Sequence, residues 1–100
     1  MRRMLGFVLL AGGLLAASSS EIELATQVCW KKLNGKAQVE WYGHLKTIDE
    51  SDRAERVRTS TTRDIAHCVA TDTGSKRNDP SVWRIADVFV KQQFHITDTR

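Results

Sequence analysis

The segment from Trp30 to Trp41, WKKLNGKAQVEW, decides the fold class of this 100-residue chain. Asn34-Gly35 between two half-apolar arms is typical of a β-hairpin, because a type I′ turn needs two residues with positive φ. The same pair also ends helices, because Gly35 can take the left-handed C′ position after Asn34. The segment therefore predicts either a two-stranded ribbon or two consecutive helices.

Residues on both sides of the pair recur at helical spacing. Ser20 and Glu23 have the spacing of a capping box, which predicts a helix that begins at Glu21. Apolar side chains then form one stripe before the pair and a second stripe after it: Ile22, Ala25, Cys29 and Leu33, then Ala37, Trp41, Leu45 and Ile48. Both stripes favour helices.

The hairpin is the alternative, and it implies an α+β fold. It would bring Val28 opposite Trp41 on a common face. However, it would place Lys32 among apolar side chains and leave Leu45 and Ile48 without a role. We therefore favour two helices at this point of the chain.

A third helix is predicted after residue 50. Thr47 and Glu50 have the spacing of a second capping box, and Asp49 and Ser51 are alternative caps for the same helix. The residues of its apolar stripe are Ala54, Val57, Thr61, Ile65 and Cys68. Hydroxyl and β-branched side chains at 59–62 disfavour helical backbone, so we expect a break there.

The last helix has the clearest start. Asp79 and Pro80 follow a polar loop at 71–79 and supply an N-cap and a proline at the first helical position. The stripe that follows consists of Val82, Ile85, Ala86, Phe89 and Val90, and Gln93 closes it. The prediction is an all-α bundle of four or five short helices.

The first 20 residues, MRRMLGFVLLAGGLLAASSS, have the layout of a secretory signal: two arginines, an apolar run and small residues. The apolar run is shorter than the roughly 20 residues that a membrane span requires. Cleavage after Ser18 and after Ser20 both fit the small-residue rule, and an uncleaved membrane anchor is the alternative. We expect a signal peptide at 1–18, one domain at 19–100, and a periplasmic protein without stable membrane insertion.

Cys29 and Cys68 are the two cysteines of the chain. An even number of cysteines in a small exported domain is typical of a disulfide. Much of the apolar content lies in the leader, so the remaining core is thin, and domains this small commonly need a covalent link. A bridge between these residues closes a loop of about 40 residues and would stabilise the fold by roughly 4 kcal/mol. Two unpaired buried thiols are the alternative.

The pattern of polar residues does not indicate catalysis or metal binding. His44, His67 and His95 lack the local spacing of a metal site. The carboxylates near residue 50 alternate with arginines, as on a solvated helix face. The 15 lysines and arginines nearly balance the 12 acidic residues once Arg2 and Arg3 are set aside, so a basic patch for nucleic acid is missing. We expect a non-enzymatic protein without metal or cofactor.

The aromatic residues after the leader allow two interpretations. They are Trp30, Trp41, Tyr42, Trp83, Phe89 and Phe94. They can form the core, or some of them can form an exposed patch that binds a protein partner. Trp41, Tyr42 and Trp83 are the candidate partner-binding residues. A homodimer is left open.

The order of these elements carries a family resemblance. A cysteine lies in the first helix (VCWKKL, 28–33), aromatic residues lie in the second (VEWYGHL, 39–45), and a second cysteine closes a later helix (RDIAHC, 63–68). This layout resembles the HdeA and HdeB acid-stress chaperones of the bacterial periplasm and, more loosely, the Rap1a-type immunity proteins. The resemblance implies a non-enzymatic helical protein with one structural disulfide. The interval between the cysteines is short for that family.

We therefore expect a protein that binds other proteins, with an acid-stress chaperone as the first hypothesis. Protonation of the acidic residues and histidines would raise the positive charge and open a marginal domain. The second hypothesis is a specific inhibitor or immunity protein for an exported enzyme or toxin. The third is an accessory protein of an envelope secretion or conjugation machine.

Overall fold

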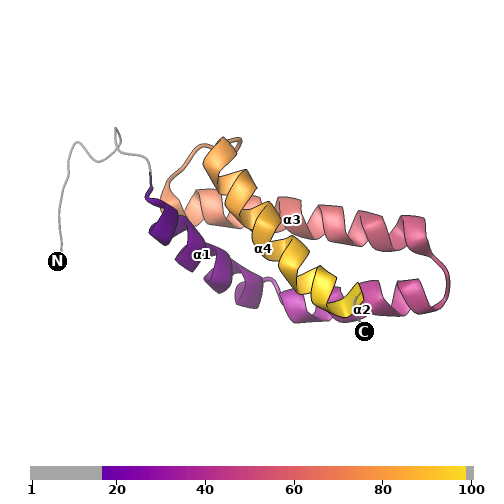
Figure 1. Ribbon diagram of the computed structural model, residues 1–100. Helices are drawn as coiled ribbons and strands as arrows, with labels where there is room; N and C mark the ends of the chain where they lie inside the picture. Colours follow the sequence, from indigo (N-terminus) through magenta and orange to yellow (C-terminus); the bar gives the residue numbers. More distant parts are fainter. Residues whose placement is uncertain (1–16, 99–100) are drawn as a thin grey trace.

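The computed structural model describes residues 17–98, which form four α-helices (Figure 1). Their bounds are α1 Ser19–Lys32, α2 Gly35–Thr47, α3 Ser51–Thr73 and α4 Pro80–Asp98. The described range contains helices and no strand, so the all-α prediction is confirmed and the hairpin alternative is wrong. None of these helices has the length and apolar character that a membrane span requires.

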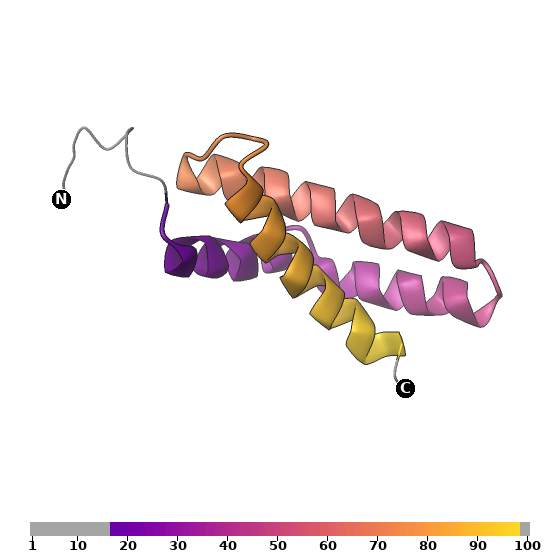
Figure 2. The same cartoon turned by 45° about the horizontal axis from the view of Figure 1, so that its top comes forward.

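The helices form two layers: α1, α2 and α3 lie side by side in one, and α4 lies across it (Figures 1 and 2). α1 and α2 follow one another along the length of α3, with α1 beside its C-terminal half and α2 beside its N-terminal half (Figures 1 and 2). α4 crosses this arrangement obliquely and contacts the other three helices. The molecule is elongated, about 52 Å long and 22 by 18 Å across.

The bend between α1 and α2 differs in detail from the prediction. Asn34 has the left-handed conformation (φ 56°), and Gly35 is already the first residue of α2. Asparagine tolerates this conformation better than most residues do. Gly35 is needed for another reason, because a Cβ atom there would overlap the indole of Trp30. The ring therefore lies directly on the backbone of the bend.

The cap of α1 lies two residues before the predicted one. The Oγ of Ser18 accepts a hydrogen bond from the backbone N–H of Glu21 at 3.2 Å, and the Glu21 carboxylate accepts one from the N–H of Ser18 at 2.7 Å. This is a complete capping box in the full-length chain. Cleavage after Ser18 or after Ser20, as expected from the sequence, would remove it. The predicted box at Ser20 and Glu23 has the same spacing, but these residues do not cap α1.

The predicted capping box before α3 is wrong. The Thr47 hydroxyl donates to the carbonyl of Gly43 at 2.9 Å, which is within its own helix. The N-cap of α3 is Glu50, whose side chain makes no capping hydrogen bond. Asp49 has a left-handed φ of 63° and follows the end of α2, so it is not a cap for α3 either.

α3 is continuous through residues 59–62, where a break was predicted. The hydroxyls in this stretch donate back to backbone carbonyls three or four residues earlier, as Thr61 does to Val57 at 2.7 Å. These bonds satisfy the hydroxyls without interrupting the helix. Because Thr61 and Thr62 are also buried, tertiary packing outweighs their weak helix propensity.

α4 begins at Pro80, as predicted. Asp79 acts as the cap, because its Oδ1 accepts a hydrogen bond from the backbone N–H of Ser81 at 2.9 Å. The helix continues to Asp98, past the predicted end at Gln93.

One core holds the helices together. Its buried members are Ile22, Cys29, Tyr42, Leu45, Ala54, Ile65, Ala66, Val69, Ala70, Val82, Ala86, Val90 and Phe94. Four of them are alanines on α3 and α4, and Tyr42 and Phe94 are the aromatic members. Trp30 packs edge-on against Phe89 and Phe94, with ring centroids 5.5 and 6.4 Å away.

The predicted disulfide is present. Cys29 of α1 and Cys68 of α3 are bonded, and their Cα atoms are 6.0 Å apart. Cys29 is fully buried in the core, and Cys68 lies at its edge. The bond therefore ties the short first helix directly to the longest one.

Candidate functional site

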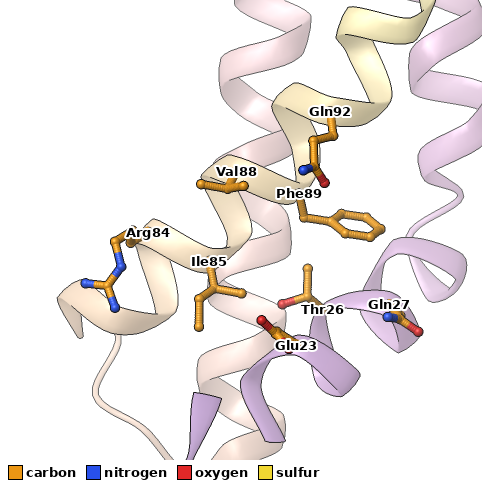
Figure 3. A pocket seen from close by; sticks show the side chains of 8 residues that line it. All are labelled: Glu23, Thr26, Gln27, Arg84, Ile85, Val88, Phe89 and Gln92. Carbon is orange, nitrogen blue, oxygen red and sulfur yellow. The ribbon is translucent and has the colours of Figure 1, made fainter. Parts of the chain in front are cut away.

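A shallow cavity of about 350 Å³ lies between α1 and α4 (Figure 3). Ile85, Val88 and Phe89 of α4 provide its apolar wall, and polar side chains of both helices surround it. The hydroxyl of Thr26, which also lines the cavity, donates to the carbonyl of Ile22 at 2.6 Å. Thr26 thus has a structural role here.

Large apolar side chains are exposed mainly on α1, α2 and the residues that end these helices. In chain order these are Leu24, Val28, Leu33, Trp41 and Ile48, with exposed fractions from 41% to 64%, and we refer to them together as the α1–α2 apolar row. Among the residues whose exposure the structure describes, Val88 on α4, at 50%, is the other large apolar residue with comparable exposure. Folded proteins bury most residues of this size, and where several exposed ones adjoin they mark a surface that binds a partner.

Trp41 is held in a fixed orientation on the surface. Its ring stacks on the imidazole of His44, with centroids 5.3 Å apart and planes 24° from parallel. The guanidinium of Arg53, from α3, lies 5.6 Å from the ring centroid. Tryptophan and arginine are both among the residue types enriched at the energetic centres of protein interfaces. Trp41 is thus the strongest candidate anchor among the predicted residues.

Tyr42 does not belong to this surface. Its side chain is only 3% exposed and packs edge-on against Phe94, with ring centroids 4.8 Å apart. Neighbouring residues on a helix point about 100° apart, so one of the pair Trp41 and Tyr42 faces the core. The candidate patch that included Tyr42 must be corrected on this point.

Trp83 is also separate from Trp41. It is half-buried, its indole N–H donates to the carbonyl of Arg77 at 2.8 Å, and its ring meets the edge of His67. The two tryptophans contact α3 at Arg53 and His67, about 21 Å apart along the helix. Trp83 therefore secures the loop before α4, and the structure does not combine it with Trp41 into one patch.

Among the residues whose burial the structure describes, no acidic or basic side chain is buried. The buried polar side chains there are Thr26, Thr61 and Thr62. A hydrogen bond from Arg58 lowers the pKa of the Glu55 carboxyl, and the same bond raises the pKa of Arg58.

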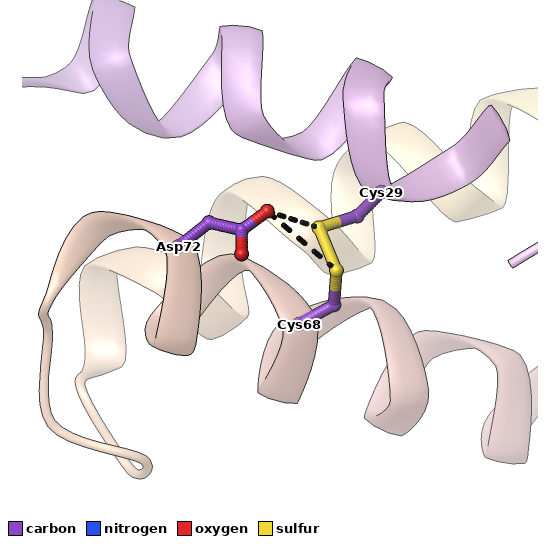
Figure 4. A group of neighbouring side chains, drawn as sticks. All are labelled: Cys29, Cys68 and Asp72. Atoms are coloured by element: carbon purple, nitrogen blue, oxygen red, sulfur yellow. Dashed lines mark hydrogen bonds between the residues drawn. A yellow bond between two sulfur atoms is a disulfide. The ribbon is translucent and has the colours of Figure 1, made fainter. Parts of the chain in front are cut away.

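Asp72 lies beside the disulfide (Figure 4). The sequence predicted the disulfide but not this position of Asp72. Its Oδ2 atom is 3.5 Å from the Sγ of Cys29 and 3.9 Å from the Sγ of Cys68. The ammonium of Lys32 donates to the same oxygen at 3.2 Å. Because a disulfide sulfur carries no proton, Lys32 is the donor that orients this carboxylate. The four-residue spacing of Cys68 and Asp72 on one helix was the available sequence signal.

Comparison with known proteins gives no match among family models, curated sequences or solved structures. Function must therefore be inferred from the surface itself.

Proposed function

We propose that this chain is a non-enzymatic periplasmic protein that works by binding other proteins, and that the α1–α2 apolar row is its binding surface. The observation that carries the proposal is Trp41, a large aromatic side chain that is 41% exposed and yet fixed by His44 and Arg53. An ordered, exposed tryptophan loses little conformational entropy when a partner covers it.

The surrounding structure supports a preformed surface. The helices that carry the row are held by a shared core, and the disulfide fixes α1 to α3. Leu24 and Val28 lie one turn apart on α1, opposite its buried residues Ile22 and Cys29. The row therefore presents apolar side chains without any unfolding of the domain.

A substitution of Trp41 tests the proposal. The protein is immobilised at neutral pH, and the partners retained from a periplasmic extract are quantified by mass spectrometry. Trp41→Ser should reduce retention of a specific partner at least about 30-fold, as for a residue at the centre of an interface. Val88→Ser is the matched control, because Val88 is similarly exposed but lies outside the row. Equal retention by Trp41→Ser and the parent protein would contradict the proposal.

The acid-stress chaperone is a second version of the same proposal, favoured by the surface position of the carboxylates. Full protonation would take the chain after the leader from about +1 to about +16, and this repulsion opposes a compact state. Reversible binding of ANS and protection of an unfolding client near pH 2 would support this version. The absence of both would remove it.

A specific inhibitor or immunity protein would bind its partner differently from a chaperone. It would form a tight one-to-one complex with one partner at neutral pH, whereas a chaperone would bind many clients only in acid. An accessory role in an envelope machine would instead make the protein's stability in the cell depend on neighbouring components. Stoichiometry measured by light scattering at pH 7 separates the first case from the others.

A further inference from the structure

We propose that reduction of the Cys29–Cys68 disulfide creates a binding site for a thiophilic divalent cation such as Zn²⁺. Cys29, Cys68 and Asp72 would be its three protein ligands. Their candidate ligand atoms all lie within 4.8 Å of one another, and Figure 4 shows the carboxylate directed at both sulfurs. The site is independent of the α1–α2 apolar row.

The geometry already fits two edges of a tetrahedral site. A Zn²⁺ ion with Zn–S bonds of about 2.3 Å and a Zn–O bond of about 2.0 Å places sulfur and oxygen roughly 3.5 Å apart. The Oδ2 of Asp72 lies 3.5 Å from one sulfur and 3.9 Å from the other. Only the two sulfurs must separate, to roughly 3.8 Å, once their bond is broken. A change of rotamer at the partly exposed Cys68 can provide this movement.

The surroundings also suit a cation. Two thiolates and one carboxylate carry three negative charges, which Zn²⁺ and the ammonium of Lys32 neutralise together. Lys32 donates to the carboxylate at 3.2 Å and so orients it, as outer groups do in known zinc sites. Cys68 and Asp72 stand four residues apart on α3, and Cys29 comes from α1, so the metal would join the same two helices as the disulfide.

The reaction balances with a dithiol as the reductant. The dithiol transfers two electrons and two protons to the protein disulfide and becomes a cyclic disulfide itself. The protein then holds two thiols. Binding of Zn²⁺ displaces both thiol protons, and a water molecule completes the fourth position.

Titration of the purified protein with Co²⁺ tests the site. The disulfide is reduced with a phosphine, the phosphine is removed without oxygen, and absorption spectra are recorded. One equivalent of Co²⁺ should give thiolate charge-transfer absorption and the intense visible bands of tetrahedral cobalt, and Zn²⁺ should displace it. The oxidised protein should give neither signal. Thiolate bands in the oxidised protein, or their absence after reduction, would overturn the proposal.

Asp72→Asn identifies the third ligand. It should weaken binding of Co²⁺ at least about tenfold, because loss of a ligand costs no less than loss of an outer partner. Asp64→Asn, an exposed position on the same helix, should leave the affinity unchanged. Circular dichroism is recorded in parallel, since the reduced protein can lose helix. Recovery of helix with the metal supports a folded site, whereas binding without recovery, or equal affinities for the two variants, contradicts it.

Discussion

Replacing Gly35 with alanine tests the packing at the bend between α1 and α2. A Cβ atom at this position would overlap the six-membered part of the Trp30 indole. The ring cannot move freely, because it packs edge-on against Phe89 and Phe94. The substitution must therefore displace Trp30 from the core or separate the two helices.

Two opposing effects set the magnitude. Insertion of a methyl group into packed surroundings typically costs about 1–3 kcal/mol. Alanine in place of glycine in a helix gains up to about 1 kcal/mol where the backbone is compatible, as it is at Gly35. We expect a net loss of about 1–2 kcal/mol. For a domain of this size, each kcal/mol lowers Tm by roughly 4–8 °C.

Urea unfolding followed by tryptophan fluorescence and circular dichroism measures this loss. A double-mutant cycle with Trp30→Leu isolates the cause, because the smaller side chain removes the overlap. In that background Gly35→Ala should be neutral or stabilising. Gly74→Ala is the control: Gly74 has φ 70° with open space around it, so its cost of about 1 kcal/mol should not depend on residue 30. If Gly35→Ala stabilises the parent protein, the reasoning about this contact is refuted.

Three further predictions concern the disulfide, the bend between α1 and α2, and the ion pair between Glu55 and Arg58. Replacing both cysteines with serine should lower the free energy of unfolding by about 4 kcal/mol, measured by urea titration, since Cys29 and Cys68 are 39 positions apart. Asn34→Ala should cost about 1 kcal/mol in the same assay, whereas Asn34→Gly should not, because φ is positive at this position. The pKa of Glu55 is lowered in the folded state, so its stabilising effect is present above its ordinary value of 4.5 and is lost as pH falls through the folded pKa. Glu55→Gln should therefore destabilise the protein by less than about 1 kcal/mol at pH 7 and by nothing at pH 2, and an equal loss at both pH values would contradict this assignment.

Local signals predicted much of this fold. Pro80 after Asp79 marks a helix start through backbone chemistry alone, and the structure begins α4 there. The disulfide followed from the number of cysteines and the small size of the domain. These features depend little on distant parts of the chain, so they can be read without knowledge of tertiary contacts.

The wrong predictions have two causes. In one case the same local pattern occurs twice, and in the other the outcome depends on tertiary contacts. The sequence SSSEIE contains the capping spacing twice, at Ser18 and at Ser20, and local spacing cannot choose between them. The predicted stripe of α2 included Trp41 and Ile48, but the structure buries Tyr42 and leaves those two exposed. Which of two adjacent aromatic residues faces the core depends on where α3 and α4 lie.

The position of Asp72 could be predicted only in part. Its spacing from Cys68 is visible on the helix, but Cys29 and Lys32 approach it from α1. Only the packing of α1 against α3 brings the four groups together. The candidate metal site therefore follows from the tertiary structure.

The intact mass of the protein isolated from its own cells, without reduction, is the most direct test of the proposal that this disulfide-bonded domain works outside the cytoplasm. We expect a chain that lacks the leader, is lighter by the two hydrogens lost on oxidation, and does not react with a thiol reagent. A chain that retains the leader and carries two free thiols would contradict this proposal.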